Sequence, residues 1–191
     1  MRTSGDDMGN ASHSRGKTST GSQTGAEALC LACGLCCNGV LFKDVELRDG
    51  DDAVRLESLG LLVERLKRKV RFPQPCSALC ADNRCRIYAD RPVRCREFEC
   101  ALLKGVSAGR VSNSEALRTI RIARHRSAKV RRLLVELGDK DEEQPLSARF
   151  RRTRRRVESG PIDENTADAY ARLSLAVHDL NLLLRDAFYP G

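Results

Sequence analysis

Nine cysteines, all lying between Cys30 and Cys100, constrain how this chain can fold more than any other feature of its sequence. So dense a set of thiols indicates that disulfides or thiolate–metal bonds stabilise this stretch in place of apolar burial. The rest of the composition agrees, because aromatic residues make up only 4% of the 191 residues and tryptophan is absent. The chain is therefore long enough for one modest core but poor in large side chains to fill it.

The N-terminal residues favour metal over disulfides. Residues 1–26 contain no apolar stretch that could form the core of a signal peptide, so we expect a cytoplasmic protein whose thiols stay reduced. The odd number of cysteines and the adjacent pair Cys36 and Cys37 also fit poorly with a framework of disulfides. No run approaches the roughly 18 consecutive apolar residues of a transmembrane helix, so we expect a soluble protein with no membrane partner.

The cysteines fall into two segments. Residues 30–37 read CLACGLCC, in which the two-residue spacing lets pairs of sulfurs converge on one ion and Gly34 supplies the permissive backbone of a tight turn. Residues 76–100 read CSALCADNRCRIYADRPVRCREFEC, where the prolines around Cys76 predict turns and one short helix. Asp90 is a candidate cap for that helix, which we expect to begin near Arg91 and Pro92.

These two segments resemble the cysteine-cluster family CxxCxxCC, whose members chelate zinc or iron. The shared pattern is CxxCGxCC followed by PC, CxIY, RP, CRxF and a final cysteine, and it covers about residues 28–102. The resemblance implies a set of eight thiolate ligands, namely Cys30, Cys33, Cys36, Cys37, Cys76, Cys85, Cys95 and Cys100. Cys80 is an addition to the pattern. Three roles are open for it: a spare thiol, a substitute ligand or a core residue. The resemblance implies no particular reaction.

The resemblance implies zinc or iron as the metal, and a [4Fe–4S] cluster is one form that iron would take. The opening CxxCxxC matches the first three ligands of a bacterial ferredoxin, but the next cysteine follows at once, which excludes a ferredoxin copy. Eight thiolates suit two four-sulfur sites, or one site with reserve thiols. The arginines at 84, 86, 91, 94 and 96 are either a solvated surface or a means of offsetting thiolate charge.

We predict an α+β fold in three regions: a disordered tail at residues 1–26, a small irregular cysteine-rich metal-bound domain at 27–105, and a helical, partly basic region at 106–191. Short strands are expected within residues 40–47 and as a pair within 61–72, with a brief helix from about 53. Apolar periodicity predicts helices near 112–137 and 163–188, and residues 146–157 read as a third, very basic helical segment. The C-terminal helices are expected to pack against the metal-bound domain.

The whole formal net charge of +8 arises in residues 121–156, which contain 13 Lys or Arg and 5 Asp or Glu. The run at 149–156 is either a solvated helix face or a surface for an acidic protein or nucleic acid. The alternative to simple metal binding is therefore a zinc-dependent module that binds RNA or an acidic protein through this region. The histidines, His13, His125 and His178, are expected not to be ligands. No glycine-rich phosphate loop, Ser/His/Asp set or paired carboxylates stand out, so neither nucleotide binding nor hydrolysis is indicated.

Overall fold

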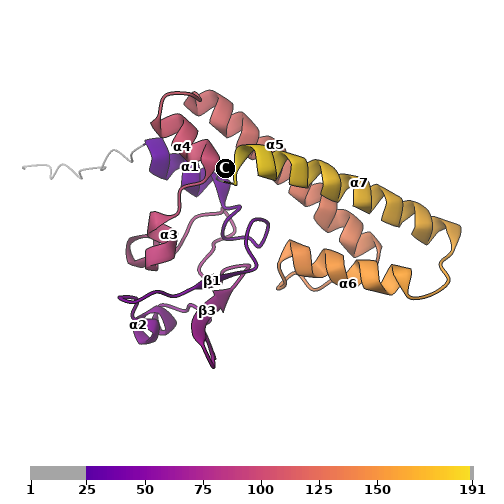
Figure 1. Ribbon diagram of the computed structural model, residues 1–191, viewed down its shortest axis with the longest axis horizontal. Coiled ribbons are helices and arrows are strands. Elements are labelled where there is room, and N and C mark those ends of the chain that lie inside the picture. Colours follow the sequence, from indigo (N-terminus) through magenta and orange to yellow (C-terminus); the bar gives the residue numbers. More distant parts are fainter. Residues whose placement is uncertain (1–24, 190–191) are drawn as a thin grey trace, which may run out of the picture.

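The computed structural model describes residues 25–189 (Figure 1). Within that range it contains seven α-helices, one short 3-10 helix and three strands, and helix far outweighs strand. The α+β class with short strands is confirmed. The predicted tail at 1–26 lies outside the described residues except where α1 begins. In chain order the elements are α1 Gly25–Cys33, β1 Asp44–Glu46, α2 Ala53–Ser58, β2 Glu64–Leu66, β3 Lys69–Pro73, η1 Tyr88–Asp90, α3 Val93–Glu97, α4 Ala101–Ser107, α5 Asn113–Glu136, α6 Leu146–Glu158 and α7 Glu164–Ala187.

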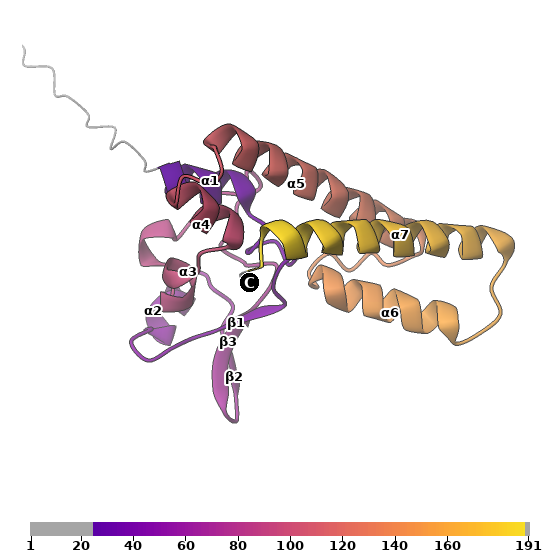
Figure 2. The same ribbon diagram turned by 45° about the horizontal axis from the view of Figure 1, so that its top comes forward.

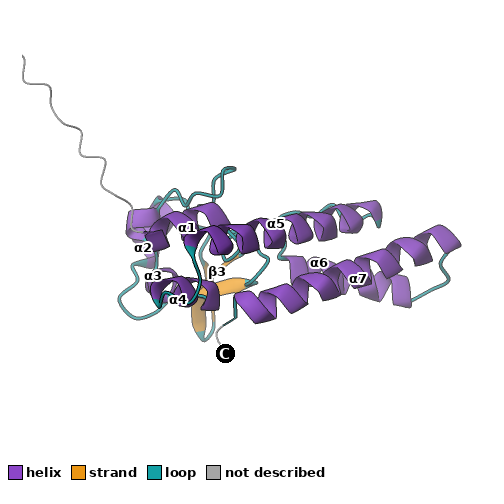
Figure 3. Cartoon of the chain, turned by 90° about the horizontal axis from the view of Figure 1, so that it is seen from above, coloured by secondary structure: helices purple, strands orange, loops and turns teal. Residues whose placement is uncertain are grey.

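Helices α5, α6 and α7 form an elongated helical arm beside residues 30–100, which carry the cysteines. Helices α5 and α7 pack lengthwise against each other, with α6 alongside and α1 and α4 against α5 (Figures 1 and 3). The first core lies among these helices and includes Leu35, Val130, Leu134 and Leu173, all with no exposed surface. The prediction that C-terminal helices pack on the cysteine-rich part is confirmed, with α5 making most of the contact.

The three strands form one antiparallel sheet in the order β1-β3-β2, which Figure 2 shows below α1, α4 and α5. Arg71 on the central strand bridges the two edge strands, with its guanidinium 2.6 Å from the Asp44 carboxylate and 2.8 Å from that of Glu64. The neighbouring residue Phe72 points to the other face and is almost fully buried. It helps form a second, smaller core of five buried residues: Leu56, Leu61, Phe72, Ala78 and Ile87. The strand pair predicted within 61–72 is confirmed, and the strand predicted within 40–47 is shortened to β1.

The long helices begin where the sequence predicts, because their caps are local. Ser112 accepts from the Glu115 amide while the Glu115 side chain accepts from the Ser112 amide, a complete capping box at the start of α5. Asp163 accepts from the Thr166 amide at the start of α7. These two helices and the basic helix α6 are confirmed.

The predicted cap of α3 is wrong. Asp90 does not cap that helix but accepts a hydrogen bond from Arg55 of α2 at 2.7 Å. The amide of Val93, the first residue of α3, donates instead to the Asp51 carboxylate at 2.8 Å. A side chain 42 positions away in sequence thus supplies the cap. The start of α3 is therefore held by the loop before α2, which carries Asp51, and not by its own flanking residues.

The reading of residues 149–156 as a solvated helix face is wrong for part of the run. Arg149 has no exposed surface, and its Nε donates to the buried carboxylate of Asp139 at 3.0 Å. Arg152 donates to the other carboxylate oxygen of Asp139 at 2.7 Å and to Asp141 at 3.2 Å. Arg149 is therefore neutralised inside the fold, and Arg152 is paired with carboxylates although about half of its side chain stays exposed.

Removing the buried anion should destabilise the protein strongly. Asp139→Ala leaves the guanidinium of Arg149 buried without its carboxylate, which we expect to lower the free energy of unfolding by about 3–5 kcal/mol. The matched control is Asp141→Ala, which removes an exposed partner of Arg152 and should cost less than about 1 kcal/mol. Urea denaturation followed by circular dichroism measures both; equal losses would contradict the prediction.

Candidate metal centre

The first cysteine segment begins on a helix and ends in a turn. Cys30 and Cys33 lie three residues apart on α1, so their side chains share one face of the helix. Gly34 ends the helix with a φ of +68°, and a Cβ there would lie 2.9 Å from Cβ of Asn83. The glycine predicted to permit a tight turn is thus required both by its backbone angle and by the close approach of the second cysteine segment. The Cys37 amide closes the turn by donating to the Gly34 carbonyl at 3.0 Å.

Two arginines of α5 hold this segment at both ends. Arg124 donates to the carbonyl of Ala32 at 3.1 Å, and Arg131 donates to the carbonyl of Asn38 at 2.6 Å. The start of α6 adds a third contact, because the Leu146 amide donates to the Gly39 carbonyl at 2.9 Å. Sequence reasoning missed these contacts, since the arginines lie in a region whose charge pointed to an external partner. Arg124 and Arg131 of α5 therefore help to position the first cysteine segment.

The second cysteine segment folds back on the first. The Cys76 amide donates to the Cys37 carbonyl at 2.7 Å, which fixes the two residues side by side. Leu79 then pairs with Cys85 in an isolated antiparallel bridge, and the Cys80 amide donates to the Arg84 carbonyl at 2.8 Å. Burial raises the pKa of the Cys85 thiol, and charge on Cys80 acts in the same direction, so the two sulfurs lie near each other. Cys80 is exposed, whereas Cys85 is half-buried.

The last two predicted ligands come from neighbouring helices. Cys95 lies on α3, and Cys100 is the residue that caps α4, where its sulfur accepts from the Leu103 amide at 3.4 Å. Helix α4 packs against α1 and so brings Cys100 to the same side of the molecule as the first segment. The end of α7 meets this region as well, because the Ala101 amide donates to the Phe188 carbonyl at 3.2 Å.

The thiols divide between the two cores. Cys33, Cys36 and Cys100 pack against the first core. Cys76, Cys85 and Cys95 pack against the second core. All nine cysteines are free, and apart from Cys30 and Cys80, whose residues are exposed, they are half-buried. Free thiols gathered at two interior surfaces are a soft donor set that suits zinc or an iron–sulfur centre and not a hard, oxygen-seeking cation.

Burial is the main influence on these thiols. It raises the pKa of Cys33 to about 12, and negative charge on Cys100 and Cys30 acts in the same direction. It also raises the pKa of Cys95 to about 12, together with charge on Cys76 and Cys85. Burial likewise raises the pKa of Cys37, and the sulfurs that act on it most strongly are those of the second segment. Without metal, these thiols keep their protons at neutral pH.

The arginines beside the cysteines have different roles. Arg91 stacks on the Tyr88 ring, 3.6 Å from its centre, and its charge lowers the pKa of Cys30, Cys85 and Cys95 against the effect of burial. Arg86 acts in the same direction on Cys76 and Cys85. In contrast, Arg84 pairs with Asp82 at 2.6 Å. The remaining pair, Arg94 and Arg96, is exposed. Of these five arginines, Arg86 and Arg91 are therefore the two that offset the negative charge of cysteine thiolates.

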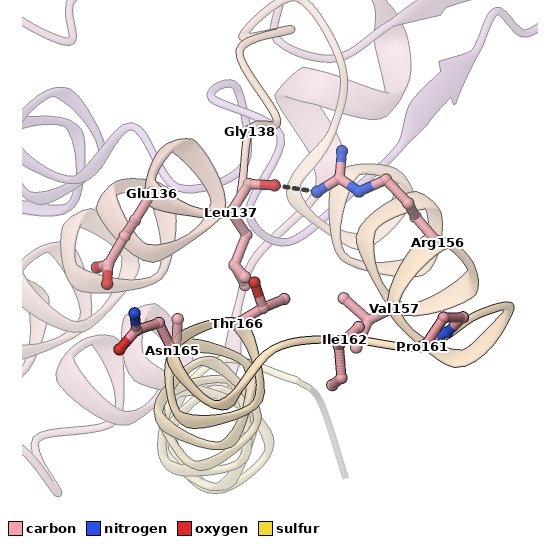
Figure 4. A pocket seen from close by; sticks show the side chains of 10 residues that line it. Glu136, Leu137, Gly138, Arg156, Val157, Pro161, Ile162, Asn165 and Thr166 are labelled. Atoms are coloured by element: carbon pink, nitrogen blue, oxygen red, sulfur yellow. Dashed lines mark hydrogen bonds between the residues drawn. The ribbon is translucent and has the colours of Figure 1, made fainter.

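The described residues, the nine cysteines included, contain no group of side chains already arranged around a metal position. Between residues 25 and 189, no three His, Cys, Asp or Glu side chains stand in an arrangement that would by itself hold an ion. His125 and His178 are exposed on α5 and α7. An open pocket of about 550 Å³ lies between the end of α5, α6 and the start of α7 (Figure 4). Its charged residues are already engaged, because Arg156 donates to the Leu137 carbonyl and Glu136 pairs with Arg172.

The raised pKa values predict how the metal-free protein responds to alkali. The folded state keeps protons on Cys33 and Cys95 up to about pH 12, whereas the unfolded chain releases them near 9.0. Their contribution to stability is therefore present below pH 9 and is lost as pH rises toward 12. Urea midpoints of chelator-treated, reduced protein should fall over that range. The fall should be weaker in the double variant Cys33→Ser/Cys95→Ser, and equal slopes would contradict the prediction.

Comparison with known proteins places the cysteine segments in a family. Residues 29–123 match the sequence model named CxxCxxCC, described as a putative zinc- or iron-chelating domain. No curated protein and no solved structure matches the chain. None of the helices within residues 25–189 combines the length and apolarity needed to span a membrane.

Proposed function

The chain belongs to the CxxCxxCC family of zinc- or iron-chelating domains through residues 29–123, and from this premise we propose that its cysteine thiolates form a resident metal centre. The metal is zinc or iron, including an iron–sulfur cluster. One observation carries the proposal. Six of the free thiols pack against the two cores, Cys33, Cys36 and Cys100 against the first and Cys76, Cys85 and Cys95 against the second.

Eight thiols are proposed as ligands and one is left out. Cys80 is left out because it is an addition to the family pattern. The hydrogen bond from the Cys76 amide to the Cys37 carbonyl places these two residues side by side and supports the inclusion of both. The proposed ligands are the eight that the family resemblance implies: Cys30, Cys33, Cys36, Cys37, Cys76, Cys85, Cys95 and Cys100.

The protein's own groups prepare the thiols for the metal. Each ligand must lose a proton on binding, and burial opposes that loss. The charges of Arg86 and Arg91 favour it, and Arg124 acts in the same direction on Cys33. A bound zinc ion would cross-link the segments, and an iron–sulfur cluster would add the capacity for electron transfer. Metal binding should therefore be tightest at neutral to alkaline pH and weaken in acid.

Elemental analysis with a visible spectrum, on protein purified without oxygen and without a metal-leaching resin, tests the proposal. Zinc in whole-number stoichiometry with a colourless solution would identify a structural or storage site. Iron with acid-labile sulfide and broad visible absorption would identify an iron–sulfur protein. Protein that contains neither metal and takes up neither after reduction would refute the proposed function.

A pair of serine variants tests the choice of ligands. Cys33→Ser removes a buried proposed ligand and should lower the metal content, whereas Cys80→Ser removes the exposed thiol and should leave it unchanged. Both replacements exchange one sulfur for one oxygen, so they form a matched pair. Equal metal content in the two purified variants would show that the ligand assignment is wrong.

Removal of the metal should unfold residues 30–100 before the helical arm. The second core has only five buried residues, while α5 and α7 pack through the larger first core. Hydrogen exchange with and without a chelator should show loss of protection in β1, β3 and α3, with α5 and α7 retaining theirs. Unchanged protection of the strands after verified metal loss would contradict this expectation.

A further inference from the structure

Helix α5 contains a long stretch without acidic residues. Between Glu115 and Glu136 it has no Asp or Glu but seven Lys or Arg, namely Arg118, Arg121, Arg124, Arg126, Lys129, Arg131 and Arg132. Both flanking carboxylates are engaged, because Glu115 completes the capping box with Ser112 and Glu136 pairs with Arg172. The positive charge of α5 is therefore not offset within the helix.

The rest of the described structure does not neutralise these seven charges. Among residues 25–189, none of them forms an ion pair with a carboxylate. Arg124, Arg126 and Arg131 donate instead to backbone carbonyls, those of Ala32, Asp179 and Asn38. A carbonyl group carries no net charge, so these guanidiniums are held in place and stay cationic.

The other four cations form one row with a histidine on the outward face of α5. The row consists of Arg118, Arg121, His125, Lys129 and Arg132, all of them exposed. Successive members lie 3, 4, 4 and 3 residues apart, a spacing that keeps side chains on one face of a helix. The buried residues of α5, among them Ala123 and Val130, lie on the opposite face. Figure 2 shows α5 along the upper margin of the helical arm, where no other helix covers it.

The row has the dimensions of a surface for an extended polyanion. It is about 21 Å long, because 14 residues separate Arg118 from Arg132 and a helix rises about 1.5 Å per residue. Like charges three or four positions apart on a helix repel each other, and an anion lying along the row would relieve that repulsion. A nucleic-acid duplex carries one phosphate charge per roughly 1.7 Å of its axis, so about six base pairs span the row.

We propose that this basic row of α5 binds the phosphate backbone of a double-stranded nucleic acid. The surface is separate from the metal centre and involves none of the thiols. Its contacts are with phosphates, so the binding is independent of base sequence.

The side chains around the row favour a duplex over other anionic partners. Single strands stack their bases on aromatic side chains, and α5 contains none. A membrane surface or a protein partner needs a continuous apolar area to bury. The exposed apolar residues of α5 form no such area, because Leu117 and Val135 lie on one side of the row and Ile122 on the other.

The structure thus moves the expected anionic surface from α6 to α5. Positive charge is densest in the sequence at residues 149–156 of α6, yet Arg149 there is buried against Asp139. Arg152 and Arg154 of the same run are also paired with carboxylates. Helix α5 carries its cations at lower density but unpaired, and it is therefore the surface that attracts phosphate.

Fluorescence anisotropy with short RNA and DNA duplexes of one sequence, on the full-length protein with its native metal, tests the proposal. Four phosphate contacts predict that the logarithm of the dissociation constant rises with the logarithm of salt concentration with a slope of about 3.6. The triple variant Arg121→Gln/Lys129→Gln/Arg132→Gln removes three contacts, so its slope should fall to about 0.9. Affinity at low salt should fall roughly 10-fold or more in the same variant.

The matched control is Lys140→Gln/Arg151→Gln/Arg155→Gln. It also removes one lysine and two arginines that are exposed and stand outside the described ion pairs, but these lie on α6 and in the loop before it. The net charge therefore changes equally in the two variants, and only its place differs. The control should keep the slope of the wild type and bind within about threefold of its affinity, because salt screens charges that do not touch the duplex. Circular dichroism checks that both variants are folded.

Each remaining outcome also decides the question. Binding to the RNA duplex, to the DNA duplex or to both supports the proposal, and the tighter of the two identifies the natural class of partner. Absence of binding to either duplex at low salt, or equal losses in the two triple variants, would overturn it. Tighter binding to the separated single strands, to polyglutamate or to vesicles of anionic lipid than to the duplexes would overturn it as well.

Discussion

The scarcity of apolar side chains between β1 and α3 is the constraint on which the rest of this structure depends. The second core buries only five residues, among them Phe72 and Ile87. A fully buried large apolar side chain contributes about 1.5–3 kcal/mol, while ordering the backbone of each residue costs roughly 1–2 kcal/mol. Residues 44–97 contain many more ordered residues than buried ones, so apolar burial alone leaves this region marginal. Bonds through sulfur are the additional source of stability that its sequence offers.

The helical arm is stable by different means and serves as the support. Helices α5 and α7 pack through the first core, and α5 then holds the first cysteine segment through Arg124 and Arg131. The positive charge of this region is thus partly structural. Arg149 and Arg152 are engaged with Asp139, which leaves fewer cations for an anionic partner than the sequence indicates.

Most of the helical fold could be predicted because its signals are local. Apolar periodicity and the caps at Ser112 and Asp163 lie within the helices that they define. The short helices α1 and α4 were not predicted, because brief helices are stable only through packing, and α1 packs on α4 and α5. The cap of α3 was predicted wrongly for the same reason, since Asp51 is distant in sequence and meets Val93 only in the folded chain.

The sequence by itself determined the donors: the number and spacing of the cysteines, the glycine that turns the chain at Gly34, and the soft chemistry that suits zinc or iron. Tertiary structure alone decided which thiols become neighbours. Spacing suggests that Cys36 and Cys37 act together, yet one packs on the first core and the other is bound to Cys76. The reason is physical, because neighbours in space are chosen by backbone hydrogen bonds and helix packing between segments that lie far apart in the sequence.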